Sequence, residues 1–224
     1  MLNHRYDRNL IISPEEQDAL RNKKVAVLGA GGLGGYVSEM LARMGIGHLL
    51  VFDFDEFSES NLNRQVVSTE ENLGCNKARE TKKRISKVNS EVDVQTVETK
   101  LSPDEIKELL AGCDVIADCL DTVRDKLLLQ NIARELGIPM IHGAIGGWFG
   151  QVTTIMPGND TLNMIYPNGE EPDSSDGNPS FTPAVIAGIQ VSEAVKVLLG
   201  YEDILQRKLL VMDLFANEVQ VAEL

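Results

Sequence analysis

The stretch from Val25 to Asp55 most constrains how this chain can fold. A short apolar run enters the glycine-rich sequence GAGGLG at Gly29–Gly34, and a helical stretch and a second apolar run then lead to Asp53. This order of strand, glycine turn, helix, strand and acidic residue is typical of a nucleotide-binding βαβ unit, which has about 20 residues between the last glycine and the acid. We therefore predict an α/β protein that binds a nucleotide at this turn.

Three of the glycines have separate expected roles. Gly29 permits the tight turn, Gly31 lets backbone N–H groups approach a phosphate, and Gly34 lets the helix pack closely on the strand. The phosphate would lie at the helix N-terminus, where unpaired N–H groups and the helix dipole favour an anion. The turn alone does not choose between a dinucleotide coenzyme and ATP.

Composition limits the possible partners and location. The 224 residues suit one large α/β domain, and a formal net charge of -13 argues against a nucleic-acid partner. Cys75, Cys113 and Cys119 are odd in number and unclustered, which favours a reducing cytoplasm over a disulfide framework. We find no uninterrupted apolar stretch near the ~20 residues that cross a membrane, so no membrane partner is expected.

The remaining pattern predicts a Rossmann-like three-layer αβα fold. We expect residues 1–22 to form an N-terminal helical arm, with Ser13 and Pro14 at the helix start, and residues 23–224 to form a single domain. Strand–helix repeats followed by consecutive strands predict a mixed sheet, parallel first and antiparallel at its C-terminal edge. Residues 157–183 are rich in turn formers and acids and predict a long exposed loop. Further strands are expected at about 92–99, 114–119, 139–142, 152–156, 209–213 and 218–222, and helices at about 77–88, 102–112, 124–136 and 184–199.

A polar loop follows the second strand of the nucleotide-binding unit. In an open α/β sheet, ligands bind outside the carboxyl ends of the strands, so side chains of this loop can reach a bound nucleotide. Asp53 and Asp55 supply acceptors beside it. The candidate contacts in the loop are Ser60, Asn61, Asn63, Arg64 and Gln65.

Two charged residues at later element ends are further candidates. Lys77 opens a helix, where the dipole disfavours a cation unless it faces a phosphate. Asp121 follows a short buried-type strand, with Thr122 beside it, and could hold Mg²⁺ with substrate phosphates. Asp118 is the alternative metal ligand, and a helix cap is the alternative role for Asp121. His142 is expected to be a packed strand residue.

The ordered motifs GAGGLG, DFD, SNLNRQ, GCNK and DCLD, the SEAVKVLLG helix and the LLVMDL strand resemble the MoeB/ThiF/HesA group of adenylyltransferases. These are bacterial relatives of ubiquitin-activating enzymes, and the resemblance covers nearly the whole chain. It implies that ATP reacts with the C-terminal Gly-Gly carboxylate of a ubiquitin-like sulfur-carrier protein. The products would be an acyl-adenylate and pyrophosphate, in sulfur transfer for molybdopterin-type or thiamin-type cofactor synthesis.

The resemblance also implies residue roles. Gly32 and the other turn glycines would line ATP, and Asp53 would bind the ribose. Asn61 and Arg64 would contact phosphates, and Lys77 would neutralise their charge. Asp121 would hold Mg²⁺, and Arg8 would reach into the partner's site of a homodimer. Without the resemblance, Arg8 is equally compatible with a solvated terminus. Cations and Mg²⁺ are what the reaction needs, because a carboxylate attacking an α-phosphate meets like charge.

The chain departs from the family at its cysteines. Many members bind structural zinc through two CxxC pairs, whereas the first pair's positions fall here near Thr161 and Met164, and no cysteine follows Cys119. We therefore predict no structural zinc. The nucleophilic cysteine of some relatives is absent as well, and Cys75 is expected to be structural.

Three other functions remain open at this stage. The glycine turn also suits an NAD-dependent oxidoreductase, although the polar loop and Lys77 have no evident role in hydride transfer. ATP-dependent activation of a nucleic-acid or small-molecule carboxylate is a related possibility, and the acidic charge disfavours RNA. A non-catalytic carrier-binding scaffold is the third.

Overall fold

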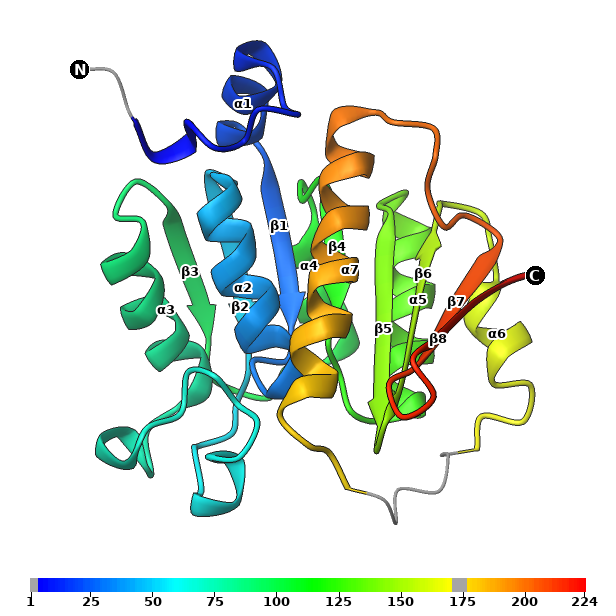
Figure 1. Cartoon of the computed structure of the whole chain (residues 1–224). Helices are drawn as coiled ribbons and strands as arrows, with labels where there is room; N and C mark the ends of the chain where they lie inside the picture. Colours follow the sequence, from blue (N-terminus) through cyan, green and yellow to red (C-terminus); the bar gives the residue numbers. More distant parts are fainter. Residues whose placement is uncertain (1–3, 171–176) are drawn as a thin grey trace.

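An eight-stranded mixed sheet forms the middle layer of the protein, with strands in the order β3-β2-β1-β4-β5-β6-β7-β8 (Figure 1). The computed structural model describes residues 4–170 and 177–224. The strands are β1 (Lys24–Leu28), β2 (His48–Phe52), β3 (Asp93–Val97), β4 (Val115–Asp118), β5 (Met140–Gly146), β6 (Phe149–Ile155), β7 (Lys208–Asp213) and β8 (Glu218–Glu223). Strands β1 to β5 pair in parallel, and the pairs from β5 to β8 are antiparallel. The predicted mixed α/β fold is confirmed.

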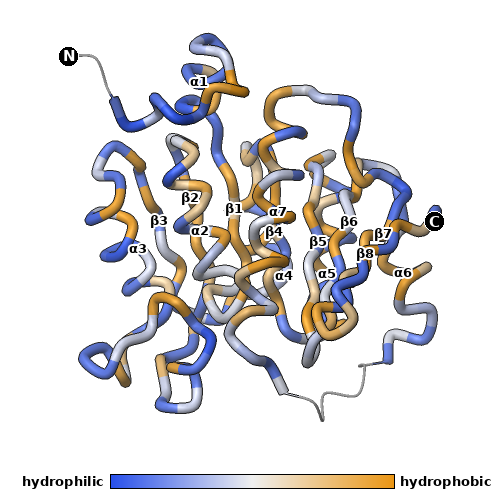
Figure 2. The backbone as a smooth tube through the Cα atoms, in the orientation of Figure 1, coloured by the Kyte–Doolittle hydropathy of each residue, from blue (hydrophilic) through white to orange (hydrophobic). Residues whose placement is uncertain are grey.

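Helices cover both faces of this sheet. They are α1 (Pro14–Arg21), α2 (Gly32–Met44), α3 (Lys77–Val88), α4 (Pro103–Leu110), α5 (Val123–Leu136), α6 (Thr161–Ile165) and α7 (Phe181–Leu199), with short 3₁₀ turns at His4–Tyr6, Glu59–Asn61 and Glu70–Asn72. Helices α2, α3 and α7 pack in one core cluster, and α4, α5 and α6 pack in the other. Val25 and Val27 of β1 face the first cluster, and Ala26 and Leu28 face the second. Apolar residues accordingly concentrate along the central strands (Figure 2).

Helix α7 is long and apolar enough, by length and composition, to cross a membrane. Slightly more than half of it is buried inside the domain, where Ile186 and Ala187 are fully covered. It packs along α2 and over β5 and β6. Its apolar character is therefore explained by its place in the core of this domain.

Residues 157–183 do not form one long exposed loop. Helix α6 lies within this stretch and buries Thr161 and Leu162, and α7 begins at Phe181 rather than at Ala184. The loop prediction averaged composition over the whole stretch and so missed the local apolar group around α6, which packs against α5. Residues 171–176, the acidic part of the predicted loop, lie outside the described residues.

Strands β5 and β6 are longer than predicted and pair over Met140–Gly146 and Phe149–Ile155. The sequence between the predicted strands is rich in glycine, which lowers strand propensity. Two of these glycines are required by packing. A Cβ at Gly143 would lie 2.3 Å from Gln190 Cδ, and one at Gly150 would lie 2.2 Å from Ile186 Cγ1. Glycine therefore lets α7 lie close on this hairpin.

Candidate nucleotide-binding site

The chain order reverses at β1, which lies between β2 and β4 in the sheet. From β1 the chain proceeds to β2 and β3 on one side and then crosses to β4 on the other (Figure 1). Loops leaving such a point diverge and open a crevice at the carboxyl ends of the strands. The predicted site residues other than Arg8 lie in the segments that leave β1, β2 and β4 or at the start of the helices that follow.

Two glycines of the β1–α2 turn are fixed by packing. Gly29 has a φ of 93° and donates its N–H to the Phe52 carbonyl at 2.9 Å. A Cβ at Gly29 would lie 2.5 Å from the Cys119 carbonyl oxygen, and one at Gly34 would lie 1.7 Å from the Gly29 carbonyl oxygen. These two glycines let the turn pack against the end of β4 and let α2 start directly above it.

Gly31 and Gly32 face more open surroundings. A Cβ at Gly31 would lie 3.5 Å from Gln65 Nε2, and one at Gly32 would lie 3.7 Å from Pro183 Cβ, which are ordinary contact distances. Gly31 is the N-cap of α2, and no side chain of the described residues caps this helix. The first N–H groups of α2 are therefore available to an anion, with the positive end of the helix dipole behind them. This turn has the chemistry of a phosphate cradle.

Asp53 braces the glycine turn from the end of β2. Its Oδ2 accepts the Ala30 N–H at 2.7 Å, and its Oδ1 accepts the Asp55 N–H at 2.9 Å. Burial raises the pKa of the Asp53 carboxyl group above its usual value, while these two N–H donors and the nearby charge of Lys77 oppose the rise. A second acceptor site on each oxygen is left for a ligand hydroxyl.

Lys77 is held at the same strand end by the start of α3. Asn76 caps α3 through Oδ1, which accepts the Arg79 N–H at 3.0 Å, and its Nδ2 donates to the Asp53 carbonyl at 2.9 Å. Lys77 is buried, and its Nζ lies 3.3 Å from Asp55 Oδ2. The cation that the sequence analysis expected to face a phosphate thus has Asp55 as its partner here.

The polar loop between β2 and α3 lies over the glycine turn. Arg64 Cγ is 3.9 Å from the position of a Cβ at Gly32, and Arg64 Nη1 donates to the Ser60 carbonyl at 2.8 Å and to Asn63 Oδ1 at 2.9 Å. Asn63 Nδ2 donates to the Asn178 carbonyl at 3.0 Å, which connects the loop to the segment before α7. The guanidinium group is therefore oriented by its own loop.

Two amide side chains of this loop are buried. Asn61 Oδ1 accepts the Ser58 N–H at 3.0 Å, which uses one side of its amide to shape the loop. Gln65 lies against Gly31, and its Oε1 has no hydrogen-bond partner among the residues that the structure describes. Ser60 is exposed, and its Oγ lies 3.0 Å from Ser58 Oγ.

The end of β4 separates the two candidate metal ligands. Asp121 is exposed and makes no hydrogen bond with the described residues, so its carboxylate is free to contribute to a Mg²⁺ site together with phosphate oxygens. Asp118 is fully buried and bonded to Lys126 and His142, which excludes it as the ligand. The cap of α5 is Thr122, whose Oγ1 accepts the Asp125 N–H at 3.2 Å, so the alternative cap role of Asp121 is wrong.

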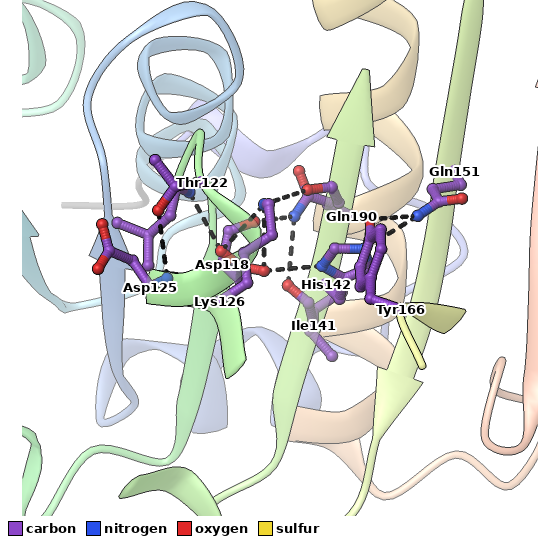
Figure 3. Close-up of polar contacts among 11 residues, drawn as sticks. Asp118, Thr122, Asp125, Lys126, Ile141, His142, Gln151, Tyr166 and Gln190 are labelled. Atoms are coloured by element: carbon purple, nitrogen blue, oxygen red, sulfur yellow. Dashed lines mark hydrogen bonds and ion pairs between the residues drawn. The ribbon is translucent and has the colours of Figure 1, made fainter. Parts of the chain in front are cut away.

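A buried polar cluster of Asp118, Lys126, His142 and Gln190 lies at the end of β4 (Figure 3). Lys126 and Gln190 belong to it and were missed by the sequence analysis. The available signal was a cation one turn into α5 and a glutamine in the mainly apolar α7. His142 is packed in β5 as predicted, fully buried, and burial together with the charge of Lys126 lowers its pKa.

Arg8 lies apart from this group. Arg8 is exposed in the N-terminal segment, which lies at the opposite end of the sheet from the carboxyl ends of β1 and β2 (Figure 1). Cys113 and Cys119 are free thiols whose pKa is raised by burial. Among residues 4–170 and 177–224, no three His, Cys, Asp or Glu side chains gather as a metal-binding group.

The architecture defines a Rossmann-like α/β protein whose strand order switches direction at β1. The ThiF family model matches residues 6–224, and the chain belongs to this family.

Named relatives cover most of the chain. It is 36% identical over 217 residues to the SAMP-activating enzyme E1 of Haloferax volcanii, covering 93% of this chain and 80% of that protein. It is 33% identical over 225 residues to the sulfur carrier protein adenylyltransferase of Thermus thermophilus, covering 93% and 82%. A crystal structure of PaaA superposes with a TM-score of 0.83 at 26% identity, covering 98% of this chain and 72% of that one. The chain spans only 48% of the adenylyltransferase and sulfurtransferase MOCS3 of Drosophila sechellia.

Proposed function

We propose that this chain uses ATP to adenylate the C-terminal Gly-Gly carboxylate of a small ubiquitin-like sulfur-carrier protein. A carboxylate oxygen of the carrier attacks the α-phosphorus of ATP, the bond to the bridging oxygen breaks, and pyrophosphate leaves. The proposal is supported by membership of the ThiF family, by a relative named SAMP-activating enzyme E1 and by a relative named sulfur carrier protein adenylyltransferase. The pathway we expect is sulfur transfer for a molybdopterin-type or thiamin-type cofactor, in the cytoplasm.

One observation supports assigning this reaction to the strand-end residues. Free N–H groups of α2, the guanidinium of Arg64 and the ammonium of Lys77 belong to segments that meet at one edge of the sheet. The attacking carboxylate and the triphosphate are both anionic, so the reaction needs fixed positive charge more than it needs a nucleophilic side chain. Hydride transfer would give these cations no role, which disfavours the oxidoreductase alternative.

The remaining candidates supply the rest of an ATP site. Asp53 would accept the ribose hydroxyls, and Gly31 and Gly32 would let the backbone approach the phosphates. Asp121 would bind Mg²⁺ through one carboxylate, with phosphate and water oxygens completing the shell. The ion would neutralise phosphate charge. The Lys77 ammonium would interact with both Asp55 and a phosphate, since its Nζ already lies 3.3 Å from the Asp55 carboxylate.

A homodimer is part of the proposal. The N-terminal segment, which carries Arg8, lies at the opposite end of the sheet from the site of its own chain (Figure 1). A second copy could present Arg8 at that site. Leu10 and Ile11, just after Arg8, are 85% and 93% exposed. Apolar side chains this exposed on one segment favour burial against a partner surface.

The test is ATP–pyrophosphate exchange with Gly-Gly-ending carrier proteins. Arg64→Ala and Asp121→Ala should each lower exchange by about 100-fold or more, because each removes charge stabilisation of the reacting phosphate. Lys82→Ala removes an exposed cation from α3 and is the matched control, which should retain wild-type exchange. Wild-type rates in both site variants would refute the assignment.

Cofactor choice tests the function class separately. Mg²⁺-ATP should raise the thermal unfolding midpoint, and NAD(H) should not, because a ligand stabilises the fold that binds it. The reverse result would favour the oxidoreductase. ATP binding without any exchange would favour the carrier-binding scaffold.

A further inference from the structure

A charged cluster is buried at the end of β4, beside the neighbouring strand β5 (Figure 3). Asp118 and His142 are 0% exposed and Lys126 is 3% exposed. Lys126 Nζ lies 3.3 Å from each Asp118 carboxylate oxygen and donates to the Gly143 carbonyl at 3.0 Å. His142 Nδ1 lies 2.7 Å from Asp118 Oδ2. The cluster thus joins α5 to two neighbouring strands, β4 and β5, just before the turn that carries Asp121.

Helix α7 contacts β4 and β5 from the other face of the sheet. Gln190 Nε2 donates to the Asp118 carbonyl at 2.9 Å and to the Ile141 carbonyl at 3.2 Å. A Cβ at Gly143 would lie within 2.3 Å of the Gln190 side chain, so glycine is needed to admit it. Asp118 is therefore held by its side chain from one face of the sheet and by its carbonyl from the other.

The Asp118 carboxylate also shapes the turn that carries Asp121. Its Oδ1 accepts the Leu120 N–H at 3.1 Å. The Cys119 N–H donates to the Leu28 carbonyl at 2.9 Å, and the Lys126 N–H donates to the Thr122 carbonyl at 3.1 Å. Asp121 is thus an exposed residue in a turn whose backbone is hydrogen-bonded both before and after it.

The same turn supports the glycine loop. The Cys119 carbonyl oxygen lies so near Gly29 that no Cβ fits between them. The turn that carries Asp121 therefore packs directly against the β1–α2 turn.

We propose that the Lys126–Asp118 ion pair positions Asp121 for binding of Mg²⁺-ATP. The inference rests on the proposed function. Lys126 and Asp118 are positioning residues, since both side chains are buried and neither is accessible to a ligand. A buried ion pair adds little net stability compared with apolar residues of similar volume, so its effect is expected in geometry more than in the free energy of unfolding.

The test is a double-mutant cycle on Mg²⁺-ATP affinity, measured by isothermal titration calorimetry. Asp118→Asn with Lys126→Met keeps the cluster neutral, because Lys126→Met alone would leave Asp118 buried and unpaired. We expect this pair variant to weaken Mg²⁺-ATP binding by about 10-fold in the wild-type background and by less than about 2-fold when Asp121→Ala is also present, since residues acting through one another are non-additive. Lys126→Arg retains the charge and should bind within about 3-fold of wild type.

Controls separate positioning from loss of structure. Lys107→Met removes an exposed ion pair to Glu135 and should leave Mg²⁺-ATP affinity unchanged. Equal losses from the pair variant in both backgrounds would overturn the inference, as would unchanged affinity in the pair variant, and both results would leave the proposed function standing. A wild-type protein that binds no Mg²⁺-ATP would overturn the proposed function and the inference together. Urea unfolding of each variant checks that the comparison is made on folded protein.

Discussion

Gly32 and Gly34 lie two residues apart in the first turn of α2, yet a methyl group would meet different surroundings at each. At Gly34 it would lie 1.7 Å from the Gly29 carbonyl oxygen, which is backbone and cannot move aside. At Gly32 the nearest atoms are side-chain carbons at 3.7 and 3.9 Å. Gly34 is thus required for folding, and Gly32 is available to the ligand.

This difference predicts opposite results for two alanine substitutions. Gly34→Ala should lower the free energy of unfolding by about 1–3 kcal/mol or more through overpacking. Gly32→Ala should leave it unchanged or raise it by up to about 1 kcal/mol, because alanine favours helix, while weakening ATP binding by about 10-fold. Urea unfolding and calorimetric titration measure the two effects. If Gly32→Ala binds ATP like the wild type, the phosphate does not lie on this turn.

At the scale of elements, the sequence predicted those whose pattern is local and missed those made by distant contacts. The N-cap of α1 is confirmed, because Ser13 and Glu16 lie three residues apart and bond reciprocally at 3.2 and 2.8 Å. The Asp118–Lys126 pair and Gln190 could not be predicted, since the pair depends on how α5 packs back against β4 and Gln190 comes from α7, 72 residues away from Asp118. Helix α6 was missed because its stability comes from α5.

Helix α6 is held by hydrogen bonds to α5. Gln130 is buried, its Oε1 accepts the Leu162 N–H at 2.7 Å, and its Nε2 donates to Asp160 Oδ1 at 2.9 Å. Gln130→Ala should lower the free energy of unfolding by about 1–3 kcal/mol, because it leaves a buried N–H without an acceptor. Asn131→Ala, next in the same helix, is the control and should change it by less than about 0.5 kcal/mol.

A chelator tests whether a metal contributes to the stability of the region around α6. We predicted no structural zinc, so EDTA should not shift the urea midpoint of the wild type. A shift on adding EDTA, restored by zinc, would show that a metal holds this region.

At the scale of the whole molecule, the proposed function calls for a residue from a second chain. The cations of the candidate site come from α3 and the loop before it, whereas the N-terminal segment, which carries Arg8, lies at the far end of the sheet (Figure 1). A two-fold dimer would present the same surface from both copies and so would complete both sites at once. The exposed Leu10 and Ile11 beside Arg8 would then be buried in the interface.

Mixing two inactive variants tests this arrangement. In a heterodimer of Arg8→Ala and Asp121→Ala chains, one site would hold both intact residues and the other neither, so random exchange of subunits should restore about a quarter of the wild-type ATP–pyrophosphate exchange. A mixture of Arg8→Ala with the Arg8→Ala/Asp121→Ala double variant should restore none, because no intact Arg8 is present. Light scattering would establish the dimer independently. Exchange that stays at the level of the separate variants, in a mixture shown to contain heterodimers, would mean that Arg8 does not act in the partner's site.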